Sequence, residues 1–300
     1  MENKGLLFSV VVPSYNRCQH LEKLIEKFSF ITYQFWELII VDDGSSDNTS
    51  ALFQKGNIER VKYIRQENKE RGAARNRGLL ESSGEYIVYL DSDDYFLPQV
   101  FDVAIEIIST NHEIPVFHLG YEVRNGNDEV VSHANLLPDL LNSLLIERNV
   151  IACLGLFMKR EVALDFMFNE DRDLSGTEDY ELWIRIAAKL PVKHFNRTVA
   201  VLVEHEGRSM LDLNVDKIVT RIERFIHYTL SNPSSAHFIG SRINEFISFR
   251  YSYIALHATL ASNKIVALKY LGKAIFHYPK LIFNKRIYVI VKKLIFGIAK

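Results

Sequence analysis

Short apolar runs alternate with helix-like patterns over the first hundred residues of the chain. The apolar runs are Leu6–Val12, Trp36–Val41, Val61–Ile64 and Tyr86–Leu90. The first two runs indicate buried central strands, and Val61–Ile64 is a weaker third. The segments between them that have helical spacing are Leu21–Phe28, Asp47–Gln54 and Ala73–Glu81. Strands that alternate with helices predict an α/β fold with a parallel sheet and right-handed crossovers.

The pattern changes after the first hundred residues. Pro115–Val123 and Glu129–Ser132 are typical of a hairpin, and Glu178–Lys189 has the pattern of an amphipathic helix. Val192–Phe195 and Thr198–Val203 are predicted to be two short strands. From about Asp212 the pattern is helical to the end of the chain. We therefore predict two domains, a catalytic α/β domain over residues 1–211 and a helical extension over residues 212–300.

Polar clusters follow three of the predicted strands at the point where each strand ends. These clusters are Ser14-Tyr15-Asn16-Arg17, Asp42-Asp43 and Asp91-Ser92-Asp93. In an open α/β sheet, ligands bind at the carboxyl ends of the strands. We therefore expect the three clusters to converge on one crevice.

The acidic cluster at Asp91–Asp94 carries the clearest chemistry. Asp91 and Asp93 are separated by one residue directly after a strand, so their carboxylates can share a divalent cation. Carboxylate, phosphate and water oxygens together suit Mg²⁺ or Mn²⁺, and such an ion neutralises a diphosphate leaving group. An acidic loop that is simply solvated is the alternative for an isolated Asp-x-Asp.

Three further features have both a functional and a structural interpretation. Asp43 can bond a nucleobase or a ribose, although turn and cap chemistry explains the residues around it. Arg71 and Arg75 stand near a helix start, where they can meet a diphosphate or form a solvated basic face. Asp179 is favoured in the first turn of a helix by the macrodipole whatever its function, and it can also act as a general base.

Charge is distributed unevenly along the chain. The net charge is −1, but no acidic residue follows Glu245, whereas ten Lys or Arg residues do. These cations alternate with Ile, Phe and Tyr, for example over residues 278–296, a composition suited to an anionic membrane interface. A helical bundle with a basic outer face is the equal alternative.

The sequence has no feature of a secreted or membrane-spanning chain. It begins without a signal-peptide pattern, contains no long uncharged apolar span, and has only Cys18 and Cys153 as cysteines. We therefore expect a cytoplasmic protein, with peripheral attachment to the inner face of the membrane as an option.

Several enzyme classes lack their motifs in this chain. No Gly-x-Gly-x-x-Gly follows the first strand, and no Gly-x-x-x-x-Gly-Lys-Ser/Thr or Gly-x-Ser-x-Gly segment occurs. Nicotinamide redox chemistry, P-loop phosphoryl transfer and serine hydrolysis are therefore disfavoured. His205, which follows Glu204, is the one histidine that we consider as an extra metal or diphosphate contact.

Five motifs in order resemble family 2 of the glycosyltransferases, over roughly residues 6–205. They are Val11–Arg17, Val41–Thr49, the Ala73-Ala74-Arg75-Asn76-x-Gly78 segment, Asp91–Asp94 and Glu178-Asp179. The resemblance implies a GT-A fold, a Rossmann-like mixed sheet that binds nucleotide sugars, and an inverting transferase. It also implies a UDP-sugar as the usual donor, with Mn²⁺ or Mg²⁺ as cofactor.

The resemblance also implies a role for each cluster. Asp43 would bond the base, Asp93 would be the principal metal ligand, and Asp91 would face the ribose or the metal. Asp179 would be the catalytic base. The remaining residues expected to bind the donor are Pro13, Tyr15, Arg17, Arg71, Arg75 and Ser92. Because the Gln-x-x-Arg-Trp motif of processive synthases is absent, we expect addition of a single sugar. The resemblance and the basic C-terminal segment favour a glycan or lipid-linked acceptor, and we expect no nucleic-acid partner.

Two alternatives to this enzyme remain open at the level of sequence. A nucleotidyltransferase also combines metal-binding carboxylates with an α/β sheet, but Pro13–Arg17 offers only one of the basic residues that its activating loop needs. The second alternative is not an enzyme: it is a module that binds a sugar nucleotide without catalysing a reaction.

Overall fold

A computed structural model describes residues 5–54, 56, 58–112, 114–133, 136–204 and 214–296. The chain forms two compact units. The first unit comprises Met1–Leu141, Ile151–Arg172 and Leu190–Glu206, and the second comprises Asn142–Val150, Asp173–Lys189 and Gly207–Lys300. The domain boundary predicted between residues 211 and 212 lies outside the described residues and stays a prediction.

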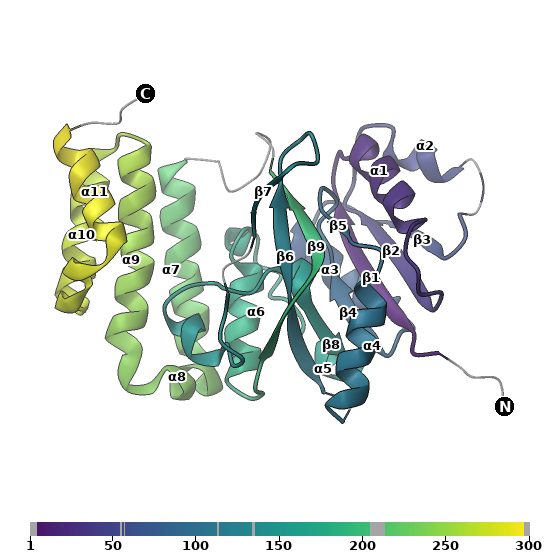
Figure 1. Ribbon diagram of the computed structural model, residues 1–300. Helices are drawn as coiled ribbons and strands as arrows, with labels where there is room; N and C mark the ends of the chain where they lie inside the picture. The colour runs from purple at the N-terminus through teal and green to yellow at the C-terminus, as the bar shows by residue number, and fades with distance from the viewer. Residues whose placement is uncertain are drawn as a thin grey trace. The chain divides into compact units, whose positions relative to one another are not determined.

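The first unit is built on a mixed sheet of nine strands (Figure 1). The strands are β1 Phe8–Ser14, β2 Trp36–Asp42, β3 Val61–Arg65, β4 Tyr86–Tyr89, β5 Tyr95–Phe96, β6 Val116–Arg124, β7 Val130–His133, β8 Leu156–Lys159 and β9 Lys193–Val203. Their order is β3-β2-β1-β4-β8-β6-β9-β5, and β7 pairs with β6. β1 is parallel to β2 and β4, and β2 is parallel to β3. β8 is antiparallel to both β4 and β6, so β6 and its parallel neighbour β9 run in the same direction as β1.

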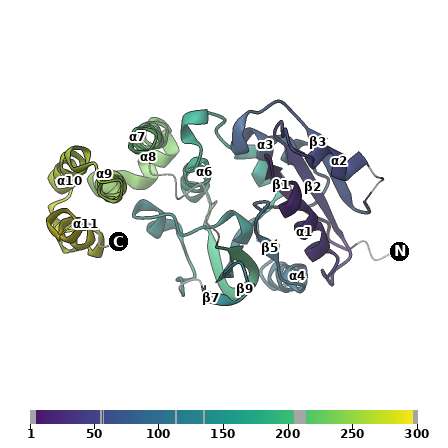
Figure 2. The same cartoon turned by 90° about the horizontal axis from the view of Figure 1, so that it is seen from above.

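Helices cover both faces of the parallel part of the sheet. The helices of this unit are α1 Cys18–Phe28, α2 Thr49–Gln54, α3 Glu70–Leu80, α4 Val100–Thr110 and α5 Arg160–Asp165. α1 and α4 pack on one face, and α3 lies on the other (Figure 2). Alternate residues of β1 point to opposite faces, so Val10 packs toward α1 while Val11 packs toward α3. Burial on both faces explains why β1 is apolar at all but one position between Leu6 and Val12, and the predicted α/β class is confirmed.

The segment 192–203 differs from the prediction. It forms one strand, β9, rather than two, and its pairing with β6 shifts register on either side of Gly120. Asn196 and Arg197 have no partners in the ladder and form an irregularity within the strand. The polar pair therefore bulges out of a continuous strand instead of making a turn. The predicted hairpin is present as β6 and β7.

In the described residues of the second unit, helices are the regular secondary structure, and short segments connect them. Its elements are the 3₁₀ segment η1 Asn142–Ile146 and the helices α6 Glu178–Ala187, α7 Val215–Ser231, α8 Pro233–Ile239, α9 Ile243–Leu260, α10 Lys264–His277 and α11 Lys285–Phe296, with 3₁₀ turns η5 Gly240–Arg242 and η6 Pro279–Phe283. α7, α9, α10 and α11 are seen nearly end-on in Figure 2, so their axes run side by side. Their shared core contains Ile222 of α7, Ile254 of α9, Tyr270 of α10 and Ile290 of α11. Among the described residues, no helix has the length and apolar character needed to span a bilayer.

A buried arginine connects α9 to two earlier parts of the second unit. Arg250 is 3% exposed and donates to the carbonyl oxygens of Glu147 at 2.9 Å and Leu145 at 3.1 Å. The same guanidinium donates to the Tyr180 hydroxyl of α6 and lies 4.2 Å from the Phe246 ring centroid. Because a buried cation needs these partners, segment 142–150 and α6 are held to the helices that follow them.

Gly78 sets the distance between α3 and the sheet. A Cβ atom added to Gly78 would lie 2.3 Å from Cγ1 of Val11 and 3.2 Å from Cγ2 of Val41. Gly78→Ala is therefore expected to lower the free energy of unfolding by about 1–3 kcal/mol, the usual cost of overpacking. Urea denaturation at 25 °C measures this change.

Gly126 provides a matched control for this substitution in the same unit. A Cβ atom added there would meet nothing within 4 Å. Gly126→Ala is expected to change the free energy of unfolding by less than about 0.5 kcal/mol. Equal stability of the two variants would contradict the packing argument.

Candidate functional site

The carboxyl ends of β1, β2 and β4 lie at the same edge of the first unit's sheet. Ser14 at the end of β1 pairs with Asp42 at the end of β2, and Val11 pairs with Tyr89 at the end of β4. The polar clusters that follow these strands therefore start at one edge, as their positions in the sequence predict.

Asp42 and Asp43 have different surroundings. Asp42 is fully buried and accepts hydrogen bonds from the Tyr63 hydroxyl at 2.6 Å and from the Ser45 N–H at 2.8 Å. Burial and the bond to Asp42 raise the pKa of Tyr63 above its ordinary value. Oδ1 of Asp43 accepts from the Gln66 side chain at 2.7 Å and from the Lys69 N–H at 2.8 Å. Asp43 is 4% exposed, and within the described residues both of these hydrogen bonds go to Oδ1 rather than Oδ2.

The loop after β1 is fastened to the loop after β2. Asn16 has a positive φ of 53°, and its N–H donates to Oγ of Ser45 at 2.8 Å while its Oδ1 accepts from the Ser46 N–H at 2.8 Å. Asp47 accepts from the Cys18 N–H at 3.1 Å. Burial alone would raise the pKa of Asp47, but the hydrogen bonds from Thr49 and Cys18 lower it below its ordinary value. The two loops are therefore positioned together.

Gly44 is required by the turn after Asp43. Its φ is +83°, and an added Cβ atom would lie 3.0 Å from the backbone nitrogen of Asn68. Both observations exclude a side chain at this position without a shift of the backbone. The turn thereby brings the segment after β3 close enough to hold Asp43.

Arg75 is a buried cation beside the acidic loop. Its side chain is 2% exposed, and Nη2 lies 2.8 Å from Oδ1 of Asp91. The guanidinium also lies 5.1 Å from the ring centroid of Phe168, which in turn packs edge-on against Tyr89. Arg75 therefore fixes the position of Asp91 and contributes a positive charge at the carboxyl end of β4.

Three carboxylates gather in the loop after β4. Oxygen atoms of Asp91, Asp93 and Asp94 lie within 4.8 Å of one another. Asp94 is 3% exposed, and its Oδ1 accepts from the Val203 N–H of β9 at 2.9 Å, whereas Asp91 and Asp93 are half-buried. This set of hard oxygen donors fits a Mg²⁺ or Mn²⁺ ion.

The other residues predicted to bind the donor flank these clusters. Pro13 lies half-buried in β1, and Tyr15 follows the strand with half of its surface exposed. Arg17 precedes the first residue of α1, and Arg71 lies half-buried in the first turn of α3. Ser92 is buried within the acidic loop, and His205 lies outside the described residues.

Asp179 lies in the first turn of α6, in the second unit. Its Oδ2 accepts from the Asn149 amide at 3.2 Å, and its Oδ1 accepts from the Tyr180 N–H at 2.7 Å. The adjacent Glu178 is 3% exposed and accepts from the Gly176 N–H at 2.6 Å. Glu178 therefore holds the turn that precedes α6, whereas Asp179 is half-buried.

Three residues in contact with the predicted site residues are not among those predicted from the sequence. Gln66 follows the short strand β3 and holds Asp43, so applying the strand-end rule to that strand would have found it. Phe168 stacks on Arg75, and Asn149 donates to Asp179. Neither has a local signal, because each meets its partner only in the folded chain.

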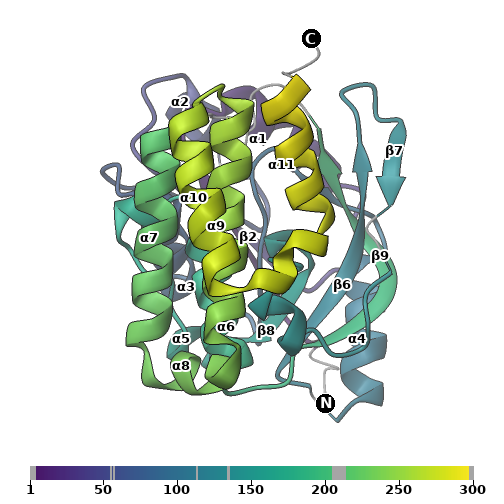
Figure 3. The same cartoon turned by 90° about the vertical axis from the view of Figure 1, so that its left-hand side faces the viewer.

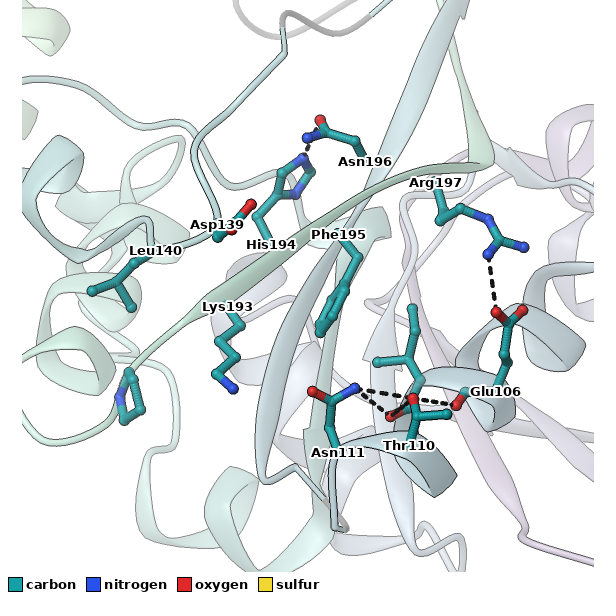
Figure 4. A pocket seen from close by; sticks show the side chains of 12 residues that line it. Glu106, Thr110, Asn111, Asp139, Leu140, Lys193, His194, Phe195, Asn196 and Arg197 are labelled. Atoms are coloured by element: carbon teal, nitrogen blue, oxygen red, sulfur yellow. Dashed lines mark hydrogen bonds and ion pairs between the residues drawn. The ribbon is translucent and has the colours of Figure 1, made fainter.

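A separate pocket of about 760 Å³ lies at the opposite edge of the sheet (Figure 4). It is bordered by the end of α4 and the start of β9, including Glu106, Lys193 and His194. Lys193 pairs with Phe117 near the start of β6, so the pocket lies at the amino ends of these strands. It contains none of the residues predicted to bind donor or metal.

A profile of Glycosyl transferase family 2 matches residues 9–163, just over half of the 300-residue chain. The chain belongs to glycosyl transferase family 2. The predicted resemblance is thereby confirmed.

The relatives of this glycosyltransferase include proteins that are longer than it is. An uncharacterized glycosyltransferase of Rickettsia felis is 27% identical over 79% of the chain, and the matched part spans 39% of that relative. The Escherichia coli protein WfgD, named a UDP-Glc:alpha-D-GlcNAc-diphosphoundecaprenol beta-1,3-glucosyltransferase, is 31% identical over 60% of the chain and 69% of its own length. The chain thus spans about two fifths of the Rickettsia felis relative.

Solved structures establish the fold of the glycosyltransferase. S. aureus TarS 1–349 in complex with UDP-GlcNAc superimposes with a TM-score of 0.68 at 19% identity, over 97% of this chain and 89% of that one. The mannosyltransferase PcManGT of Pyrobaculum calidifontis, in complex with GDP-Man and Mn²⁺, gives a TM-score of 0.54 at 14% identity, over 97% and 86%. The predicted GT-A fold with C-terminal helices is confirmed.

The bond from Val203 to Asp94 generates a prediction about the acidic loop of this glycosyltransferase. Asp94→Ala is expected to lower the free energy of unfolding by about 1–3 kcal/mol, because it removes a buried carboxylate that accepts from a part-buried N–H. Asp94→Asn keeps an acceptor oxygen and should recover most of this loss. Urea denaturation of the two variants tests the prediction, and equal losses in both would mean that the charge of Asp94, rather than its hydrogen bond, stabilises the loop.

Proposed function

We propose that this protein is an inverting, metal-dependent glycosyltransferase that transfers one sugar from a UDP-sugar to an acceptor hydroxyl. The observation that carries the proposal is the grouping of Asp91 and Asp93 with the buried Arg75 at the carboxyl edge of the sheet. TarS was solved in complex with UDP-GlcNAc, and WfgD is named for UDP-Glc, which supports UDP as the nucleotide of the donor.

Residues Asp91 and Asp93 would hold a Mn²⁺ or Mg²⁺ ion, which when bound neutralises charge on the diphosphate leaving group. The chain fixes this pair from two sides. Arg75 holds Asp91 through Oδ1, and Asp94 fastens the loop to Val203 of β9. Little reorganisation of the carboxylates is therefore needed when the donor binds.

The donor nucleoside would occupy the edge formed by the loops after β1 and β2. Oδ2 of Asp43 would accept a hydrogen bond from the base, while Gln66 and Lys69 hold Oδ1. The half-exposed ring of Tyr15 would stack on the base. The remaining donor contacts in this proposal come from Pro13, Arg17, Arg71, Arg75 and Ser92.

Asp179 would take the proton of the acceptor hydroxyl. The acceptor oxygen forms its bond to the anomeric carbon as the bond from that carbon to the diphosphate oxygen breaks, and the hydroxyl proton passes to the Asp179 carboxylate. A single displacement of this kind inverts the anomeric centre. Asn149 donates to Oδ2 of Asp179 and so holds the carboxylate in place.

The proposed acceptor is a glycan on a lipid carrier, in the assembly of a surface polysaccharide. WfgD is named for an acceptor of this class, a diphosphoundecaprenol-linked sugar. The absence of the Gln-x-x-Arg-Trp motif supports addition of a single sugar. The enzyme would then act at the cytoplasmic face of the membrane.

Asp93→Ala is expected to abolish metal-dependent donor binding, because it removes the principal metal ligand. In the wild-type protein, UDP with Mn²⁺ should raise Tm, by the equivalent of about 2.7 kcal/mol at about 100 times Kd. UDP with a chelator should raise it little. Thermal-shift measurement with UDP, GDP, CDP and dTDP, each with and without Mn²⁺, checks both the metal and the base.

Asp165→Ala serves as the control for this substitution, since Asp165 is an exposed carboxylate at the end of α5 in the same unit. It should keep the full Mn²⁺-dependent shift. An undiminished shift in Asp93→Ala would remove Asp93 from the metal site.

Asp179→Asn is expected to leave donor binding within about threefold of wild type and to reduce turnover by about 10²–10⁴-fold, the usual contribution of a general base. Calorimetry with UDP and a coupled assay for UDP release measure the two quantities. Asp173→Asn, which changes an exposed carboxylate paired with Arg224 in the same unit, should keep normal turnover. Normal turnover in Asp179→Asn would show that another group takes the proton.

A further inference from the structure

α10 carries an apolar stripe on the side away from the core of the second unit. Ile265, Leu268 and Phe276 are 84%, 59% and 84% exposed, and their spacing places them on one side of the helix. On the opposite side, Ala267 and Ala274 are buried against the neighbouring helices. In Figure 3, α10 and α11 lie nearest the viewer, in front of α9.

α11 has two apolar stripes rather than one. Its inner stripe, Ile287 and Ile290, belongs to the core of the unit. Its outer stripe, Tyr288, Val291 and Ile295, follows helical spacing and is 68%, 39% and 67% exposed. A helix that served only to cover the core would need the inner stripe alone.

The turn between these helices is also apolar on its exposed side. Phe283 of η6 is 87% exposed, and Ile282 is 51% exposed. We call the exposed side chains of α10, η6 and α11, residues 264–296, the outer face. Exposed apolar side chains on three successive elements of a folded protein mark an interaction site more often than an isolated exposed residue does.

Cations surround the apolar residues of the outer face. Lys264, Lys269, Lys280, Lys285 and Lys292 are exposed within it. In the part of the chain that the structure describes, none of these five lysines is ion-paired with a carboxylate. Because no acidic residue follows Glu245, the face contains no negative charge of its own.

We propose that the outer face docks on the surface of an anionic lipid bilayer. Apolar side chains would enter the boundary between headgroups and acyl chains, and the lysines would contact anionic headgroups. A second copy of the chain is a poor occupant, because two outer faces would bring like charges together. This inference deepens the proposed function by naming the surface from which a lipid-linked acceptor is reached, but vesicle binding can be measured without donor or acceptor.

Co-sedimentation of the full chain with vesicles tests the proposal. Phosphatidylcholine vesicles that contain about 30% phosphatidylglycerol should bind the protein at low ionic strength, and pure phosphatidylcholine vesicles should bind it at least about tenfold more weakly. Raising the salt from about 0.05 M to about 0.5 M should reduce binding to the anionic vesicles, since the shorter screening length weakens the attraction of the lysines.

Two double variants separate the two components of the outer face. Lys285→Glu with Lys292→Glu should reduce binding to anionic vesicles at least about tenfold, because four units of charge are changed near the surface. Phe283→Ser with Ile295→Ser should reduce it also at high salt, where the apolar component remains. All four positions are exposed, so the variants should fold normally.

Lys23→Glu with Phe30→Ser is the matched control, since both residues are exposed in the first unit. It should bind vesicles as wild type does. The proposal is overturned by absence of binding to anionic vesicles at low salt, or by equal binding of the outer-face variants and the control. A third result would also overturn it. If the protein does not bind vesicles but forms dimers in solution, and the outer-face variants abolish these dimers, the outer face binds a second copy of the chain instead.

The donor thermal shift, measured on the same variants, separates this inference from the proposed function. Outer-face variants that retain a wild-type shift with UDP and Mn²⁺ but lose vesicle binding support the docking surface. A protein that binds anionic vesicles through this face yet never responds to a nucleotide would refute the proposed donor and leave the docking surface standing.

Discussion

The ion pair between Arg75 and Asp91 depends on how closely α3 packs against β1. Gly78, one turn after Arg75 on the same side of α3, allows the helix to approach Val11 to a distance that no larger residue permits. At this separation the Arg75 side chain is buried, and its guanidinium meets Asp91 at the end of β4. The position of the first carboxylate of the acidic loop therefore follows from a glycine on a helix and a valine in the middle of a strand. A longer distance would leave a buried cation without its partner, which is costly in a protein interior.

The carboxylates at this edge of the sheet lie close together in the sequence but have different hydrogen-bond partners. Asp42 and Asp94 are buried and accept hydrogen bonds that hold loops, from Tyr63 and from Val203. Asp43 and Asp91 are each held through Oδ1 by another group. Acidic residues can accumulate here despite their mutual repulsion because hydrogen bonds stabilise the buried carboxylates and the Arg75 cation offsets part of the negative charge at Asp91. The arrangement is consistent with an edge that is built before a ligand arrives, which limits the reorganisation needed on binding.

The sequence predicted those features that depend on local pattern. β1, β2 and β4 follow apolar runs that end at polar residues, and the strand-end rule correctly brought Asp43 and Asp91 to one edge. The division of 192–203 into two strands was wrong, because Asn196 and Arg197 have turn-like polarity but are accommodated as a bulge by pairing with β6. Gln66, Phe168 and Arg250 were not predicted as partners, since each acts on a residue or carbonyl far away in the sequence, and no periodicity encodes such a choice. The comparisons confirm the family and the GT-A fold, while the activity and the role of each site residue stay predictions.

Arg250 changes how the helical part of the protein is understood. The C-terminal helices could have been a separate appendage, but this buried guanidinium bonds the carbonyls of segment 142–150 and the hydroxyl of Tyr180, next to Asp179. Asn149 of the same segment donates to Asp179. The proposed base and the proposed bilayer-docking face therefore belong to one compact unit, whereas the proposed ligands of donor and metal belong to the other. Since a lipid-linked acceptor is reached from the bilayer, the unit that would contact the bilayer is also the one that would remove the proton from the acceptor hydroxyl. Under the proposed roles, donor binding would belong to the α/β unit and deprotonation of the acceptor to the helical unit, which contains the helices after residue 214.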